Sequence, residues 1–176
     1  MSAPDDEPVN LVAGAEFKCF SYNSLPRLRA ELRDLGFVVY ELDGGQIRDR
    51  RSLDQAFRTS LPSPAWGPPP YRFVWDAFID KFCDWADEVH ETTGAERIAI
   101  LWLGADRLLG DRLPLLIESI CVLTCIFDYL RYRHLRLGPN LAADNPPLTV
   151  RAFLIGQGPG FPELPVATEE PEEDTL

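Results

Sequence analysis

Apolar side chains recur at helical spacing in two segments of the chain. Leucines appear every three or four residues between 24 and 35, and large apolar side chains do so between 75 and 90. This spacing predicts one amphipathic helix over each segment. The inward stripe of the second helix is expected to consist of Phe78, Phe82, Trp85 and Val89.

A third helix is predicted over 52–61, because Ser52 and Gln55 have the spacing of a capping box. The following stretch, 62–70, contains five prolines and cannot form a helix or a central strand. We expect it to be a stiff loop with aromatic side chains in it or directly beside it.

The longest apolar segment, from about 111 to 133, predicts a fourth helix that Asp111 can cap. This segment is apolar on most of its sides, so we expect the fold to cover it on two faces. Cys121 and Cys125 lie one turn apart in it and are expected to be buried thiols.

Four short runs rich in apolar, β-branched and aromatic residues alternate with these helices. They predict strands over 17–22, 37–42, 97–103 and 148–155. Strands separated by helices are joined by right-handed crossovers, which make the strands parallel. The predicted fold class is therefore α/β, with a small parallel sheet of three or four strands and helical crossovers.

The formal net charge of −11 is concentrated at the two ends of the chain. Residues 1–9 contain three acids and residues 163–176 contain six, without a base in either, so the rest of the chain has a net charge of −2. Acidic ends with few apolar residues predict disorder over 1–15 and 159–176, around one domain over 16–158. The overall acidity also argues against direct nucleic-acid binding, because phosphates would be repelled.

Several classes of enzyme and cofactor site find no support in the sequence. It has no phosphate-binding glycine motif, no G-x-S-x-G motif and no C-x-x-C, and only two histidines accompany its four cysteines. We therefore expect no catalytic residue, no metal and no cofactor, in a protein that is not an enzyme. The acidic start does not resemble a secretory signal, and we find no membrane span, so we expect a cytoplasmic protein.

The outward side of the predicted helix over 75–90 is strongly acidic. Residues 75–88 hold five acids against one base, Lys81. A helix that needs only solubility would more naturally mix signs, because like charges one turn apart are mildly destabilising. From the pattern alone, the simpler interpretation is still a solvated face, neutralised in the fold by nearby arginines. The acids at four-residue spacing are Asp76, Asp80, Asp84 and Glu88, and the candidate arginines are Arg50, Arg51, Arg58 and Arg72.

Three motifs follow one another in a recognisable order: E-L-D-G-G-Q-I-R at 41–48, S-L-D-Q-A-F at 52–57 and W-D-A-F-I-D at 75–80. Together with the loop rich in proline and aromatic residues, they resemble the barstar family, the intracellular inhibitors of secreted bacterial ribonucleases. The predicted strands and helices further along agree with this, so the resemblance covers roughly residues 16–156. The strand and helix within 16–35 look like an extension found in longer family members.

The resemblance implies a barstar-like fold and stoichiometric, non-catalytic binding of a basic ribonuclease or nuclease toxin, as expected of an immunity protein. In the family, carboxylates of this helix stand in for RNA phosphates, and a loop aromatic packs into the nuclease cleft. We expect the free chain to be a monomer. The implied partner-binding residues are Asp76 and Asp80 at the two family aspartates, Ile79 beside them, Asp84, and either Trp66 or Tyr71 as the loop aromatic.

The loop departs from the family pattern, which is an aromatic-Phe-Gly-x-Asn sequence. If Trp66 preserves its start, P-P-P-Y-R-F is inserted before Val74; if Tyr71 is the aromatic, Arg72 and Val74 stand where Gly and Asn belong. An arginine in the contact loop would repel a basic nuclease. The alternative function is therefore a degenerate barstar-like module that binds another protein through the same helix. An enzyme that uses the carboxylates is the least favoured interpretation.

Overall fold

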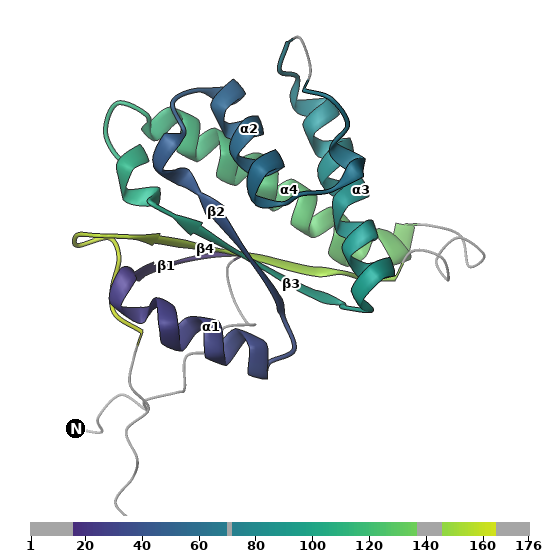
Figure 1. Ribbon diagram of the computed structural model, residues 1–176, viewed down its shortest axis with the longest axis horizontal. Coiled ribbons are helices and arrows are strands. Elements are labelled where there is room, and N and C mark those ends of the chain that lie inside the picture. Colours follow the sequence, from purple (N-terminus) through teal and green to yellow (C-terminus); the bar gives the residue numbers. More distant parts are fainter. Residues whose placement is uncertain (1–15, 70–71, 137–145, 165–176) are drawn as a thin grey trace, which may run out of the picture.

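All four strands of the sheet are parallel and follow the order β1-β4-β3-β2, with helices on both faces (Figure 1). The computed structural model describes residues 16–69, 72–136 and 146–164. The strands are β1 (Phe17–Ser21), β2 (Val38–Asp43), β3 (Arg97–Leu103) and β4 (Thr149–Gly156). The helices are α1 (Leu25–Asp34), α2 (Arg50–Ser60), α3 (Trp75–Thr93) and α4 (Leu113–Arg136).

The predicted α/β class, with a parallel sheet and helical crossovers, is confirmed. Each predicted element is present, and its ends agree with the prediction to within one helical turn. The start of α2 differs, because its N-cap is Asp49 rather than Ser52. The Asp49 carboxylate accepts the Ser52 N–H at 2.8 Å, and the Ser52 hydroxyl accepts the Asp49 N–H at 2.9 Å, so the capping box lies one turn earlier.

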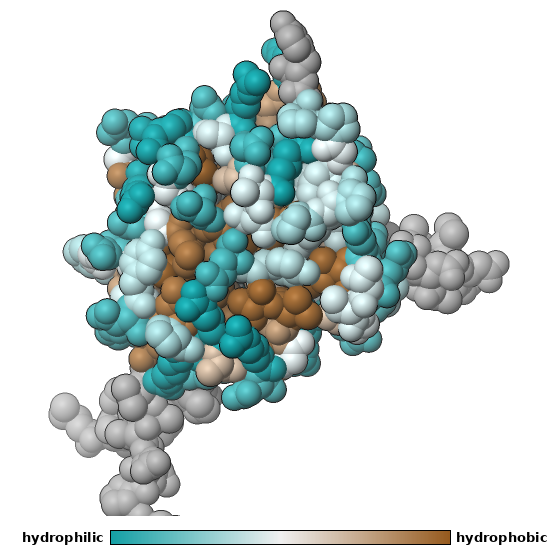
Figure 2. Space-filling model, viewed as in Figure 1, coloured by the Kyte–Doolittle hydropathy of each residue, from teal (hydrophilic) through white to brown (hydrophobic). Residues whose placement is uncertain are grey.

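The two faces of the sheet bury separate clusters of apolar side chains. On one face α1 packs alone, and Leu28 and Leu32 of α1 share a cluster with Leu101 and Phe153 of the sheet. On the other face, α2, α3 and α4 enclose the larger cluster (Figure 1). Figure 2 shows apolar side chains in the band between α1 and the helices of the other face, where the edge of the sheet lies.

The packed part of the chain extends beyond residue 158, the expected end of the domain. Phe161 and Leu164 are buried, one in each apolar cluster. The Leu164 N–H also donates to the buried Ser24 hydroxyl at 2.6 Å, at the start of α1. The predicted boundary is therefore too early, because these two apolar side chains, with hydrogen bonds from residues 21–24 to Pro162 and Glu163, hold the segment on the fold. The other parts predicted to be disordered, 1–15 and 165–176, lie outside the described residues.

The helix that differs most from the prediction is α4, because only one of its sides is covered. Its inward side belongs to the larger cluster, whereas Cys121 and Cys125 are exposed, so the prediction of buried thiols is wrong. By length and composition alone α4 would suffice to span a membrane, although a helix with one side in a protein core passes the same test. The inward residues are Leu116, Leu123, Ile126, Phe127 and Leu130.

Candidate functional site

The helix α3 separates an aromatic side from an acidic side, because both residue types recur in step with the helical turn. It begins after the extended Val74 and ends at Gly94, whose φ of 70° closes the last turn. The predicted inward stripe is confirmed, since all four of its members are buried. The most enclosed is Phe82, which is 0% exposed and makes ring contacts with Phe57 and Trp85. This packing holds α3 in one orientation.

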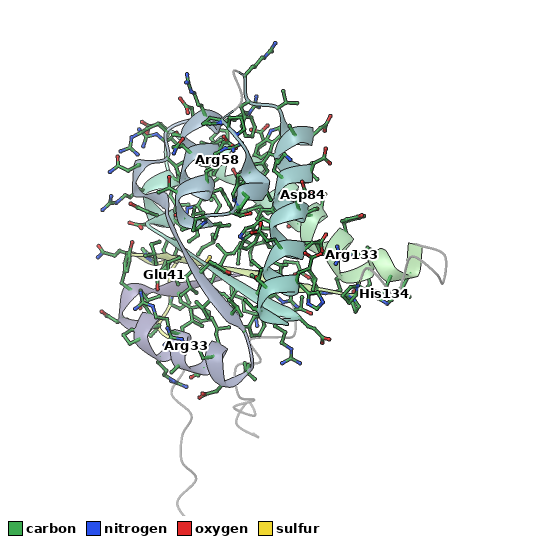
Figure 3. The ribbon with its side chains drawn as sticks, turned by 45° about the vertical axis from the view of Figure 1, so that its right-hand side comes forward. Arg33, Glu41, Arg58, Asp84, Arg133 and His134 are labelled. Carbon is green, nitrogen blue, oxygen red and sulfur yellow. The ribbon has the colours of Figure 1, made fainter. Side chains whose placement is uncertain are left out.

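Asp76, Asp80 and Asp84 are exposed on the outward side of α3 (Figure 3 labels Asp84). The Lys81 ammonium group lies 3.2 Å from Asp84. Among the described residues, neither Asp76 nor Asp80 has an ion-pair partner. Two carboxylates one turn apart therefore present their charge to the surroundings.

The four arginines that were candidates to neutralise this side form ion pairs elsewhere or form none with the described residues. Arg50 pairs with Glu118 of α4 at 2.6 Å, and Arg58 pairs with an acid of its own helix at 2.6 Å. Arg51 and Arg72 form no ion pair with the described residues. Ion pairs between these four arginines and the outward aspartates are thus not observed among the described residues, although the exposure of the aspartates agrees with a solvated face.

Two further acids of α3 are engaged within the fold. Glu88 accepts a hydrogen bond from the Ser63 hydroxyl in the loop that precedes α3. Asp87 pairs with Arg133 of α4 at 2.6 Å, and that arginine side chain is 3% exposed. The exposed acidic surface is therefore shorter than the acidic pattern in the sequence, because Asp87 and Glu88 bind α4 and the loop.

Trp66, one of the two candidates for the loop contact, lies in the core and not on the surface. It is 3% exposed, and its indole N–H donates to the Leu61 carbonyl at 2.6 Å. The Arg58 guanidinium lies 5.5 Å from the centre of the ring and donates to the Trp66 carbonyl at 2.6 Å. Burial of the large ring stabilises the loop, so Trp66 is an anchor and does not reach a partner in this conformation. Tyr71, the other candidate, lies outside the described residues.

The remaining loop and helix positions form a mixed surface around the aspartates. Arg72 and Val74 are both exposed just before α3 begins. Ile79, the implied neighbouring contact, is half-buried and packs against the larger apolar cluster. A partner that reached Asp76 and Asp80 would therefore also meet apolar side chains and one arginine.

A groove of about 680 Å³ lies between the outward side of α3 and α4. Asp80 and Asp84 of α3 line it, together with Tyr129 and Arg133 of α4. Figure 3 shows Arg133 beside α3. Neither α4 residue could be predicted from the sequence to belong to a site, because their place next to α3 depends on how two distant helices pack. No local motif carries that information.

The groove also contains a thiol that is not poised for reaction. Cys83 of α3 lines it, and burial, with the negative charge of Asp87 nearby, raises the pKa of this thiol to about 12. The side chain therefore stays protonated at neutral pH and is a poor nucleophile.

Within residues 16–69, 72–136 and 146–164, no group of three or more His, Cys, Asp and Glu side chains is placed to hold a metal ion. The surface combines fixed negative charge with apolar area, which suits the binding of a basic protein.

Comparison with known proteins adds no further assignment. No protein-family model, no curated protein and no solved structure shows significant similarity to this chain. The resemblance to the barstar family therefore rests on the sequence alone, chiefly on the motifs at 41–48, 52–57 and 75–80.

Proposed function

We propose that this chain is a barstar-like inhibitor that binds a basic ribonuclease or nuclease toxin in the cytoplasm through α3. The observation that carries the proposal is the pair Asp76 and Asp80, two exposed carboxylates one turn apart without an ion-pair partner among the described residues. Both lie in the motif W-D-A-F-I-D, on which the family resemblance depends most. The proposed mode of action is stoichiometric binding, without a cofactor, a metal or a catalytic residue of this chain.

The physical basis is that a ribonuclease active site is positively charged in order to bind RNA phosphates. Carboxylates on a helix present the same charge without a bond that the enzyme can cleave, so they fill the site and are not consumed. Complementary charge speeds the encounter, and burial of the charge pairs slows dissociation. Because the other side of α3 is packed with aromatic rings, the helix backbone is already ordered and loses little entropy on binding.

The test is a titration of RNA cleavage by a basic ribonuclease with the parent chain and with Asp80→Ala. Truncation leaves a nuclease cation buried without its partner, so binding should weaken by about 2–5 kcal/mol, mainly through faster dissociation. That range derives in part from the barnase–barstar complex, so it is not independent of the family resemblance. Inhibition by Asp80→Ala that equals inhibition by the parent would rule out the carboxylates as the inhibitory groups.

The matched control is Asp34→Ala. Asp34 is an exposed acid on α1, which covers the opposite face of the sheet. Its removal changes the net charge of the chain by the same amount as Asp80→Ala does. It should only slightly slow association, because charges far from the interface act at long range and are screened by salt.

A second candidate is a barstar-like module that binds another protein through the same side of α3 and inhibits no nuclease. The loop favours it, because Trp66 is buried and Arg72 is exposed, so the loop presents a positive charge and keeps the Trp66 ring from a partner. The equimolar titration separates the two functions. Unchanged RNA cleavage with a panel of basic ribonucleases would favour the binding module.

A further inference from the structure

The outward side of α4 forms an apolar stripe that nothing in the described part of the chain covers. Its side chains are far more exposed than those of the inward side: Ile117 is 53% exposed, Tyr129 43% and Tyr132 44%. Cys121 and Cys125 are exposed between them, at successive turns of the helix. Most of an amphipathic helix's outward side is polar, so this side is unusual for a helix that only faces water.

The stripe is continuous with the groove between α3 and α4. Tyr129 belongs to both, because it is exposed on α4 and also lines the groove. Ala77, Ile79 and Cys83 add apolar area from the α3 side. We call the groove and the adjoining stripe together the α3–α4 trough; its apolar side chains come from both helices and lie beside charged ones.

The unpaired charge beside the described part of this trough is negative, because Arg131, which lies over the Tyr132 ring, pairs with Glu16. Asp80 and Asp84 line it from α3, and Asp128 is exposed on α4 between Cys125 and Tyr129. The two cations that line the groove are already engaged: Lys81 lies 3.2 Å from Asp84, and the buried Arg133 pairs with Asp87. A partner that supplies positive charge at its edges would therefore be attracted, and an acidic partner would be repelled.

We propose that this α3–α4 trough binds an amphipathic helix of a partner protein whose apolar face is flanked by lysines and arginines. A helix laid in a groove between two helices buries apolar side chains at three- and four-residue spacing, and its flanking residues reach the rims. Here the apolar face would lie on Ile79, Tyr129 and the α4 stripe, and the flanking cations would meet Asp80, Asp84 and Asp128. The surface does not require that the partner be a nuclease.

A second copy of this chain is the less suitable occupant. The stripe is apolar enough for self-association, but each copy would bring its own Asp80 and Asp128 to the contact. Like charges placed together across an interface cost free energy, whereas a basic helix gains from the same acids. Charge complementarity therefore selects the basic partner.

The experiment uses three labelled peptides of about 18 residues, each roughly 27 Å long as a helix. The probe carries leucines on one face and lysines elsewhere; one control replaces lysine with glutamate, and the other replaces leucine with serine. Binding to the parent chain is measured by fluorescence anisotropy, without any nuclease present. The Leu/Lys peptide should bind at least roughly tenfold more tightly than either control, which corresponds to ~1.4 kcal/mol.

The place of binding is tested by substitution and by thiol protection. Tyr129→Ala should weaken binding of the Leu/Lys peptide roughly tenfold, because it removes an aromatic side chain from the centre of the contact. Leu109→Ala is the matched control, since Leu109 is 49% exposed and does not line the groove. On the unsubstituted chain, the bound peptide should also slow the alkylation of Cys125, so the result does not depend on how a variant folds.

Each other outcome overturns the proposal. Equal binding of the Ser/Lys peptide would mean that acidity alone attracts the probe. Equal binding of the Leu/Glu peptide would mean that the acids play no part. If no peptide binds and the parent chain sediments as a dimer that Tyr129→Ala dissociates, a second copy covers α4. Because the peptide assay contains no nuclease, its failure is distinguishable from a failure of the nuclease titration.

Discussion

Two long helices, α3 and α4, pack on the same face of the sheet and expose sides of opposite character. On α3 the outward side carries Asp76, Asp80 and Asp84, and the inward side carries aromatic rings. On α4 both sides are largely apolar, and the outward one remains exposed. Figure 1 shows α4 behind α2 and α3.

The difference shows how a sequence fixes the rotation of one helix and leaves that of another open. A helix with one apolar and one acidic side has a single favourable rotation, because any other would bury carboxylates at a large cost. A helix that is apolar nearly all round can bury several different sides at similar gain. The rotation of α4 is therefore set by particular contacts, such as the pair between Arg133 and Asp87 and the pair between Arg50 and Glu118.

The strongest test of the rotation of α3 is Phe82→Ala. Phe82 is fully buried among aromatic side chains, so its truncation should lower the free energy of unfolding by about 3–5 kcal/mol, through lost burial and the cavity left behind. Asp80→Ala, at an exposed position two residues earlier, should change it by about 0.5 kcal/mol or less. Urea unfolding measures both. A larger cost for Asp80→Ala would mean that α3 is turned round and that its binding side is misassigned.

The contact between the two helices is tested by Asp87→Ala. Removal of this carboxylate leaves the buried Arg133 guanidinium with its bond to the Pro146 carbonyl but without its ion-pair partner. Unfolding should become easier by about 1–3 kcal/mol, the cost of a buried charged group that loses a hydrogen bond. Asp84→Ala is the control, because its pair with Lys81 is exposed and worth at most about 1 kcal/mol. Equal effects of the two substitutions would contradict the burial of Arg133 against α3.

The smallest effect concerns the pH dependence that Glu118 confers. The Arg50 guanidinium, with help from the Trp75 N–H, holds the pKa of Glu118 below its usual range. A lowered pKa contributes stability above the ordinary value for Glu, about 4.3, and that contribution is lost as the pH falls through the pKa in the folded protein. Glu118→Gln should therefore be less stable than the parent near pH 6. Because the pair is exposed, the difference in the free energy of unfolding should be ~1 kcal/mol at most, and it should disappear toward pH 3.

The control for this series is Glu91→Gln, at an exposed position of α3 without an ion pair among the described residues. Thermal melts at several pH values compare both variants with the parent. A gap between Glu118→Gln and the parent that stays constant from pH 6 to pH 3 would show that Glu118 contributes through packing and not through its charge.

The loop before α3 shows what the sequence left open about the site. Its prolines exclude helix and central strand, so its irregular course follows from the sequence. The sequence does not determine whether Trp66 points outward as a contact or inward as an anchor, because a large aromatic ring suits both. Arg58 lies eight residues earlier and on another element, yet it holds Trp66 in place through a hydrogen bond and a cation–π contact. Only the packing of α2 against the loop brings the two together.

The sequence by itself determined the α/β class, the order and approximate ends of the elements, the inward stripe of α3 and the acidic side opposite it. Each of these depends on spacing within one segment, which the backbone geometry converts directly into a face. The tertiary structure decided that Asp76 and Asp80 have no partner among the described residues, that Asp87 and Glu88 do, that Trp66 is buried, and that α4 exposes an apolar side next to the acids. Those outcomes depend on which distant side chains meet, and contacts between elements are set by the packing of the whole chain.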